Sequence, residues 1–348
     1  MVTITSCKKN EETSKKQEAT FDIKAASNLV EAYMNAVENG NMENIKKFYS
    51  AKLLKNVVAS ENKEFKVVGF NILETSKVGE SGLFKIRVAR SSTVKPLASL
   101  DEYVIKVIKE GFDYKIDDTN NIGIKEAFPE YSEIRLKSKN NVNTNLLFDM
   151  DTIPNYAFSK DDKANMLKLP VPKSNFGIMA FSYNGDMLAL TTFDSDSFIG
   201  YVKINEAMEV QNAGKEEGAG GGGKSTDKTQ SGNAREKPVG KELIILDLIK
   251  GSKIEFITFS QDEKYIGLEY NKASFVRCIR VYKTDNGDMI DYKFEEKFPI
   301  NLVDVNFSSF DKEVINFDVV AKNPSDKSLN DYIGKWQLNI KELKSKKI

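Results

Sequence analysis

One stretch of the sequence matches a chemical motif letter by letter: GAGGGGKST at residues 218–226. Its glycines, Lys224 and Ser225 satisfy the pattern of a phosphate-binding loop, in which backbone N–H groups cradle phosphates while the lysine and serine serve the terminal phosphate and Mg²⁺. A working loop of this kind follows a buried strand and opens a helix whose N-terminus holds the anion. Polar residues flank the stretch on both sides, so we interpret the match as a coincidence and expect no bound nucleotide.

Other catalytic chemistry is restricted by composition. The 348 residues include no histidine, which excludes Ser-His-Asp and Cys-His nucleophile systems and imidazole-ligated zinc. Cys7 lies in a polar N-terminus and Cys278 in an apolar strand pattern, so we expect neither a disulfide framework nor a metal cluster. We interpret Cys278 as a core residue. We therefore assign no catalytic residue, no metal site and no cofactor.

Carboxylates are the remaining source of acid–base chemistry. The turn TFDSDS places Asp194 and Asp196 close together, but it lacks the glycine and the distant glutamate of a calcium-binding loop. Among the 51 acidic residues no spacing selects one pair for glycoside hydrolysis. A carboxylate-dependent hydrolase therefore stays open as an alternative without assigned residues.

The charge balance bears on partners and source. Lys plus Arg and Asp plus Glu each total 51, and no segment clusters basic residues as a nucleic-acid-binding surface would. We expect no nucleic-acid partner. Only six of the basic residues are arginine, and lysine, asparagine and isoleucine are abundant, a bias typical of AT-rich genomes. The sequence indicates a low-GC, clostridia-like bacterium.

The N-terminus reads MVTITSCKKNEETSKKQEATFD. Ile4-Thr5-Ser6-Cys7 resembles the lipobox of bacterial surface lipoproteins, where an aliphatic residue and two small residues precede the cysteine that receives diacylglycerol. Residues 1–20 would then form a lipobox remnant and a polar tether, because they are too polar to pack. The resemblance implies lipidation of Cys7 and an extracytoplasmic, membrane-anchored protein.

The lipoprotein interpretation requires sequence upstream of Met1. A signal peptide has a charged region and roughly 7–15 apolar residues before its cleavage site, whereas six residues precede Cys7. The alternative is a cytoplasmic interaction protein in which Cys7 is incidental. No other segment reaches the ~18 apolar residues needed to cross a bilayer, so we expect any membrane attachment to be through lipid.

Residues 21–125 form the first expected domain. Apolar residues from Ala25 onward recur at three- and four-residue steps until Asn39-Gly40, which predicts a helix, and a second helix follows. Beyond Lys63 the apolar period becomes two, which predicts a meander of long antiparallel strands. This order indicates an α+β domain with two helices on a curled antiparallel sheet.

Two segments of this region, AYMNAVENGNMENIKKFYS and VIKVIKEGFDYKIDD, carry a family resemblance. They are similar to the nuclear-transport-factor-like, cystatin-like superfamily that includes scytalone dehydratase, which implies a cone-shaped sheet enclosing a pocket. Arg90 continues an apolar strand face and would lie near the open end of the cone with Tyr103. We name Arg90 and Tyr103 as candidate ligand-binding residues; the alternative is an arginine that extends to solvent at the rim.

Residues 126–348 carry a repeat. IMAFSYNGDMLALTTFD, FITFSQDEKYIGLEYN and DVNFSSFDKEVINFDV each place phenylalanine before serine, then a turn, then an alternating strand. The Phe-Ser pairs begin at positions 181, 259 and 307, and both intervals become 48 residues once the 30 low-complexity residues 211–240 are removed. We interpret 211–240 as a disordered glycine-rich insertion that interrupts a repeat between its strands.

A period of about 40–50 residues of short strands is typical of β-propeller blades. In LIILDLIKGSKIEFITFS, Asp247-Leu248, Gly251 and the following Phe-Ser pair resemble the strand–turn–strand junction of WD-type and TolB-like propellers. We expect an all-β domain that forms a small or incomplete propeller of three blades, with residues 130–173 as a candidate fourth. A β-sandwich of hairpins stays the alternative.

Together these features predict a non-catalytic cell-surface lipoprotein that acts as a binding or scaffold module. Its expected partner is an unidentified envelope protein or a small ligand. Because fold alone does not fix function, three alternatives stay open. These are a carboxylate-dependent hydrolase, a phosphate-loop nucleotide hydrolase that uses Lys224, and a cytoplasmic interaction protein.

Overall fold

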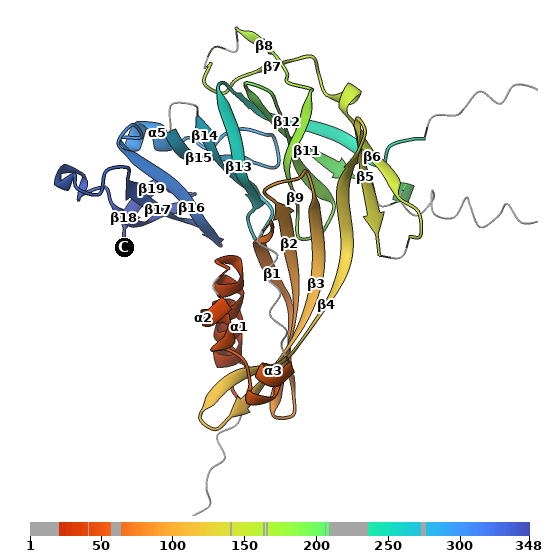
Figure 1. Ribbon diagram of the computed structural model, residues 1–348, viewed down its shortest axis with the longest axis vertical. Helices are drawn as coiled ribbons and strands as arrows, with labels where there is room; N and C mark the ends of the chain where they lie inside the picture. The colour runs from red at the N-terminus through yellow and green to blue at the C-terminus, as the bar shows by residue number, and fades with distance from the viewer. Residues whose placement is uncertain are drawn as a thin grey trace, which may run out of the picture.

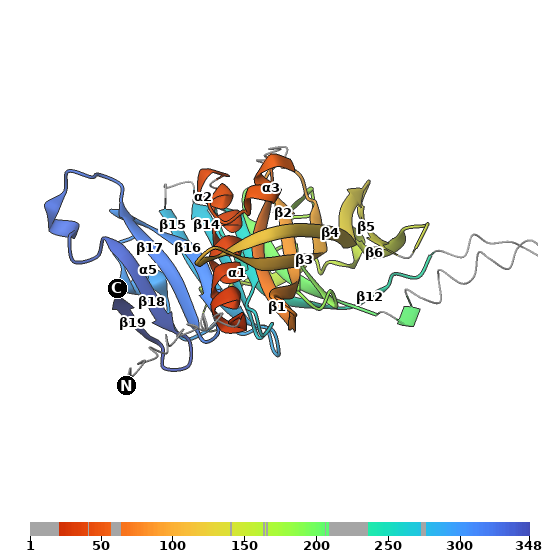
Figure 2. The same cartoon turned by 90° about the horizontal axis from the view of Figure 1, so that it is seen from below.

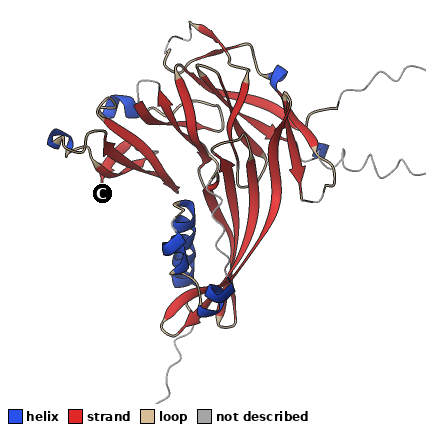
Figure 3. Ribbon diagram, viewed as in Figure 1, coloured by secondary structure: helices blue, strands red, loops and turns tan. Residues whose placement is uncertain are grey.

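A computed structural model describes residues 21–40, 42–56, 64–139, 141–162, 164, 166–205, 207–208, 236–272 and 276–348. Cys7 and the stretch 218–226 lie outside these residues, so the lipidation of Cys7 and the interpretation of the glycine-rich stretch stay predictions. The described part of the chain is mostly β, with short helices near its start (Figure 1, Figure 3). None of its helices is both long and apolar enough to span a membrane.

The first region combines helices with a six-stranded antiparallel sheet, paired in sequence order. The Asp22 side chain begins α1 by accepting hydrogen bonds from the N–H groups of Lys24 and Ala25. The elements are α1 (Ile23–Glu38), α2 (Met42–Lys46), α3 (Ala51–Asn56), β1 (Phe65–Val78), β2 (Ser81–Ser92), β3 (Ala98–Glu110), β4 (Asp113–Glu130), β5 (Glu133–Ser138) and β6 (Asn145–Asp149).

The predicted curled antiparallel sheet is confirmed. Strands β1 to β4 curl around α1, which lies between them and the sheet at the C-terminal end of the chain (Figure 1, Figure 2). The helix buries Ala26, Val30 and Met34 in one cluster with Phe84 and Ile86 of β2. The apolar stripe read from the sequence therefore faces the inside of the curl.

The second predicted helix is divided into α2 and α3. Between them Tyr49 forms a β-bridge with Ile116, and the N–H of Ser50 donates to the carbonyl of Ile116 at 2.8 Å. Backbone pairing with β4 thus replaces the helical hydrogen bonds at that point. Helical periodicity alone could not show this competition, because the partner strand lies far away in sequence.

The boundary expected between residues 125 and 126 falls inside β4, and β5 and β6 extend the same sheet. Leu100 of β3 and Ala127 of β4 are buried in one cluster with Phe181 and Leu188 of the next sheet. The two regions therefore share a strand and a hydrophobic core.

Three antiparallel meanders follow, at the places of the three repeats. The first is β9 (Asn175–Phe181), β10 (Met187–Phe193), β11 (Ser197–Ile204) and β12 (Gly240–Ile249); the second is β13 (Ser252–Phe259), β14 (Tyr265–Lys272) and β15 (Val276–Lys283); the third is β16 (Val303–Asp311), β17 (Val314–Ala321), β18 (Gly334–Asn339) and β19 (Lys344–Lys347). The insertion predicted at 211–240 falls between β11 and β12, and its residues 211–235 lie outside the described residues. Its predicted end is wrong, because Glu236 forms an ion pair with Arg135, Val239 is fully buried and Gly240 begins β12.

Smaller elements connect these sheets. They are the pair β7 (Tyr156–Phe158) and β8 (Lys168–Pro170), the helix α5 (Phe294–Lys297), and two 3₁₀ turns, η1 (Met150–Thr152) and η2 (Lys327–Leu329). The candidate fourth blade at residues 130–173 does not form one meander. Its β5 and β6 belong to the six-stranded sheet, whereas β7 and β8 pair only with each other.

The repeated serine has a structural role in two of the three repeats. Ser182 Oγ donates to Asp186 at 2.9 Å and accepts from the N–H of Met187 at 3.1 Å. Ser260 Oγ likewise accepts from the N–H of Tyr265 at 3.0 Å. In both repeats the serine closes the turn between the first two strands of a meander. The Phe-Ser pair therefore recurs in these two repeats because the serine is needed for the turn, and the apolar alternation that follows it marks the next strand.

The third repeat is in a different phase. Phe307 and Ser308 lie within β16, which has a bulge between Phe307 and Ser309. The strand continues to Asp311 and turns at Lys312, whose φ is 51°. The equal 48-residue interval therefore does not mark an equivalent hairpin, because the bulge and the tighter turn shift the strand end.

We expect Ser182→Ala and Ser260→Ala each to lower the free energy of unfolding by about 1–2 kcal/mol. Each would leave a turn N–H without its acceptor beside a buried strand. Ser308→Ala is the matched control, since Ser308 is exposed and within a strand, and it should change stability by less than about 0.5 kcal/mol. Urea denaturation measures all three. Equal effects at the three serines would contradict the structural difference.

Candidate functional site

The first strands of the sheets meet around a cavity. Residues of β1, β9, β13 and β16 line it together with the end of α1, and its volume is about 570 Å³. Ligand pockets commonly span roughly 300–1,000 Å³. These strands converge on the end of α1 in Figure 1. The charged residues of the lining are Glu38, Lys66, Lys95, Lys253, Glu255, Glu269 and Arg277.

Arg277 is neutralised inside the cavity. Its Nη2 lies 2.6 Å from Glu255 Oε2, and its Nε lies 3.5 Å from Glu269 Oε1. Burial raises the pKa of Glu269, while the N–H of Phe307, at 2.9 Å, and Arg277 act in the opposite direction. One cation therefore faces two carboxylates across a single sheet, which leaves this wall without excess positive charge.

Three lysines line the same cavity from separate segments: Lys66 on β1, Lys95 in the connection from β2 to β3, and Lys253 on β13. All three are exposed. No carboxylate among the described residues forms an ion pair with any of them. Uncompensated ammonium groups at one opening raise the local positive potential and attract anions.

Aromatic rings supply the apolar part of the wall. Phe256 and Phe307 stack with ring centroids 5.2 Å apart and an interplanar angle of 27°, and both are half-buried. Phe176 and Phe193 line the cavity as well. A ring or another flat apolar group could pack here while an attached anionic group reaches the lysines.

Glu38 lies where the cavities meet. It ends α1 and lines the large cavity and a second cavity of about 240 Å³. Asn39 and Ser308 also line both. Burial raises the pKa of Glu38 to about 8, and its carboxyl forms no hydrogen bond or ion pair with another described residue. At neutral pH the group is therefore mostly a neutral acid, although the cavity gives it partial exposure.

The structure brings Arg90 and Tyr103 together. Arg90 Nη2 donates to Tyr103 Oη at 2.6 Å, and Arg90 Nε lies 3.5 Å from Asp101 Oδ2. The guanidinium also lies 5.9 Å from the ring centroid of Phe65. Neither Arg90 nor Tyr103 lines the cavities described above. Their role in ligand binding stays a prediction, and Asp101 already compensates the charge of Arg90.

The sequence pattern contains one signal that points to Glu38. A negative charge in the last turn of a helix is unfavourable, because the C-terminal end of the helix dipole is negative. Glu38 stands directly before the Asn39-Gly40 stop signal, at the end of the helix where the dipole disfavours an ionised carboxylate. This unfavourable position is the signal that singles out Glu38 in the sequence. Lys66, Lys95 and Lys253 have no comparable signal, since 51 basic residues are spread along the chain.

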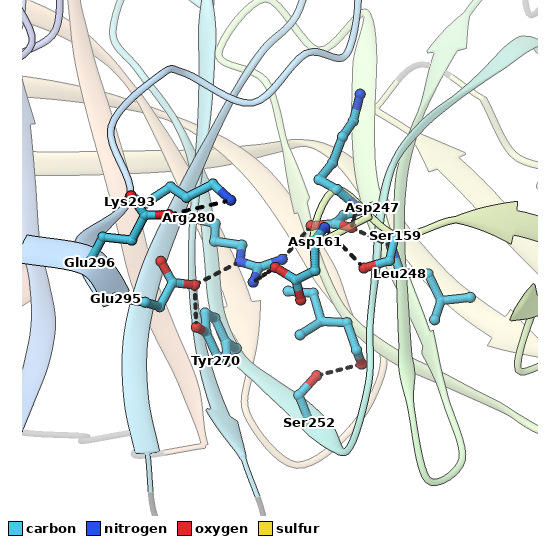
Figure 4. A network of polar contacts seen from close by, with 12 residues as sticks. Ser159, Asp161, Asp247, Leu248, Ser252, Tyr270, Arg280, Lys293, Glu295 and Glu296 are labelled. Atoms are coloured by element: carbon cyan, nitrogen blue, oxygen red, sulfur yellow. Dashed lines mark hydrogen bonds and ion pairs between the residues drawn. The ribbon is translucent and has the colours of Figure 1, made fainter. Parts of the chain in front are cut away.

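A second polar cluster surrounds Arg280 on β15 (Figure 4). The guanidinium contacts Asp161 at 2.6 Å, Asp247 at 2.7 Å and Glu295 at 3.1 Å. Tyr282 Oη donates to Asp247 at 2.7 Å. These contacts join β12 of the first meander to β15 of the second. Asp247, which the sequence places at a strand–turn–strand junction, thus has a structural partner in the next sheet.

Cys278 lies beside this cluster and is fully buried, as predicted. Burial raises the pKa of its thiol, so the group stays protonated and unreactive at neutral pH. Among the described residues, no set of three or more His, Cys, Asp or Glu side chains is placed to hold a metal ion.

No family model matches the sequence, and no curated protein matches it. A Bacteroides ovatus structure assigned as a dipeptidyl aminopeptidase IV is similar with a TM-score of 0.29 and 9% identity, over 78% of this chain and 44% of that one. A prolyl endopeptidase structure gives 0.26 and 9%, over 91% and 40%. The chain spans less than half the length of either. These are distant structural similarities that assign no activity to this chain, and the propeller and its number of blades stay predictions.

Proposed function

We propose that this protein is a non-catalytic binding protein whose large cavity takes an anionic small molecule with an aromatic or apolar body. The observation that carries the proposal is the convergence of Lys66, Lys95 and Lys253, each without an ion-pair partner among the described residues, on a cavity walled by phenylalanines. The lysines supply charge attraction and the rings supply apolar contact. Both are properties of ligand pockets.

The charge balance of the lining favours an anion. Glu255 and Glu269 are held by Arg277, and Glu38 is mostly protonated at neutral pH because its pKa is about 8. The three lysines then leave the lining with net positive charge. A bound anion would replace the solvent around these ammonium groups, and no unpaired ionised carboxylate of the lining would repel it.

The lipobox-like residues before Cys7 support a place for this binding at the cell surface. The proposal is then a lipid-anchored receptor or scaffold that meets its ligand, or an envelope protein, outside the cytoplasmic membrane. Cys7 lies outside the described residues, so this part rests on the sequence alone. A nucleotide hydrolase using Lys224 rests on the sequence alone as well, and a carboxylate-dependent hydrolase has no assigned pair.

We expect 3-phenylpropionate, which combines a ring with a carboxylate, to bind with a stoichiometry of one in isothermal titration calorimetry. Replacing Lys66, Lys95 and Lys253 by alanine together should weaken binding at least tenfold, which corresponds to about 1.4 kcal/mol. The uncharged 3-phenylpropionamide should bind the native protein as weakly as the acid binds the variant.

The matched control replaces Lys24, Lys46 and Lys55 by alanine. These are exposed helix residues that do not line the cavity, and the change in net charge is identical. If both triple variants weaken binding equally, the attraction comes from overall charge and the cavity proposal is wrong. Equal affinity for the acid and the amide would also overturn it.

A further inference from the structure

We propose that Glu38 forms a second subsite that binds a positively charged amino group, so that the ligand is a zwitterion with its anionic group at the lysines and its amine at Glu38. This inference rests on the proposed anion site in the large cavity. It adds the chemical class of the ligand, which the lysines alone leave open.

The position of Glu38 carries the inference. The residue stands between two cavities, and Asn39 and Ser308 beside it line both. A molecule extending from the large cavity toward the smaller one therefore passes its carboxyl group. Because that carboxyl has no hydrogen-bond or ion-pair partner among the described residues, it is available to a ligand. Glu38 is half-buried, and an unpaired carboxyl that lines two cavities is a candidate for ligand binding.

The smaller cavity is suited to a cation. Asp318 lines it and has no ion-pair partner among the described residues, although Lys335 stands opposite on the neighbouring strand. The ring of Trp336 lines it too, stacked on Phe317 with centroids 6.3 Å apart. Indole faces attract ammonium groups. The carboxylate of Asp318 and the indole of Trp336 thus line the same cavity as Glu38.

Other groups that could alter the charge of Glu38 face the same cavities. They are Lys66 from β1, Asp318 from β17 and Lys335 from β18. Tyr183, from the turn before β10, lines a third and much smaller cavity of about 30 Å³ that Glu38 also lines. Burial of Glu38 is the cause of its raised pKa, so neither lysine holds it ionised in the free protein.

The proton balance of binding follows from this state. In the free protein the carboxyl holds its proton, which limits the cost of leaving it without a partner. When an ammonium group binds, Glu38 releases that proton to solvent and the carboxylate pairs with the ammonium. A ligand that offers only a hydrogen-bond acceptor would instead leave the proton on Glu38. Release of a proton on binding therefore distinguishes a ligand with an ammonium group from a ligand that offers Glu38 only a hydrogen-bond acceptor.

The test compares Gly-Gly-Phe with N-acetyl-Gly-Gly-Phe. Both have the same ring and carboxylate, both can extend about 10 Å, and only the first has a free amine. At pH 7 we expect the free-amine peptide to bind the native protein at least tenfold more tightly. Titrations in buffers of different ionisation enthalpy should show release of up to about one proton for this peptide alone.

Glu38→Gln should remove both the preference for the free-amine peptide and the proton release. Glu31→Gln is the matched control, because Glu31 lies on the same helix and is exposed, and it should behave as the native protein. Thermal denaturation of both variants establishes that they are folded.

The outcomes separate this inference from the proposed function. Equal binding of the two peptides, or a preference that survives Glu38→Gln, overturns the amine subsite and leaves the anion site standing. The same holds if 3-phenylpropionate binds and neither peptide does. If none of the three binds at millimolar concentration, both the anion site and the amine subsite are wrong.

Discussion

Arg280→Met is expected to lower the free energy of unfolding by about 3–5 kcal/mol. The guanidinium is 3% exposed and Asp247 is 0% exposed, so its removal leaves a fully buried carboxylate without its cation. Methionine fills much of the vacated volume, which keeps the effect of an empty cavity small. Urea denaturation at neutral pH measures the change.

Two further variants isolate the cause. Lys203→Met removes an exposed ion pair with Glu242 between β11 and β12, and it should cost less than about 1 kcal/mol. In the double variant Arg280→Met with Asp247→Asn, the loss should be clearly smaller than the sum of the two single losses, since the one fully buried carboxylate of the cluster is then neutral. Additive losses, or an Arg280→Met effect as small as that of Lys203→Met, would show that the cluster does not join the two sheets.

The stability of the native protein should fall as pH rises from about 5 to 8, and Glu38→Gln should reduce that fall by about 2 kcal/mol. In the folded protein burial raises the pKa of Glu38 from 4.5 to about 8. Between these two values the folded state keeps a proton that the unfolded state has lost. Rising pH therefore favours unfolding. Water in the cavity screens the carboxylate, so the effect is smaller than full burial would give.

Denaturation midpoints of the native protein and the variant, measured at intervals from pH 5 to 8, check this prediction. Burial also raises the pKa of Asp101, Glu263 and Glu269, so the native protein alone cannot identify the group responsible. The difference between the native and Glu38→Gln curves does identify it. Glu31→Gln should follow the native curve, and parallel native and Glu38→Gln curves would mean that Glu38 ionises normally.

Several features of the fold were predictable because they depend on local sequence. The apolar stripe of α1, the alternation in β1 to β4 and the turn chemistry of Ser182 and Ser260 all involve residues within a few positions of one another. Arg90 and Tyr103 were also correctly brought together. They share a face of adjacent strands, and strand alternation sets which face a residue occupies.

Other features depended on contacts between distant segments. The second helix divides because β4 pairs with the chain at Tyr49, and the third repeat changes phase because β16 contains a bulge. The shared core of β3, β4 and β9 lies across the boundary predicted between residues 125 and 126. None of these contacts can be predicted from the periodicity of a single segment, because each joins residues that are distant in sequence.

The sequence by itself determined the short-range elements, the absence of histidine chemistry and the three repeated segments, since these follow from residue types and their near neighbours. Only the tertiary structure decided which charges are compensated. It holds Arg277 and Arg280 among carboxylates, and it places Glu38 where burial keeps it protonated. Within the part of the chain that the structure describes, it leaves Lys66, Lys95 and Lys253 without ion-pair partners at one cavity. Ionisation and ion pairing depend on distances and desolvation across the fold, so the candidate site emerged only once distant strands were placed around the end of α1.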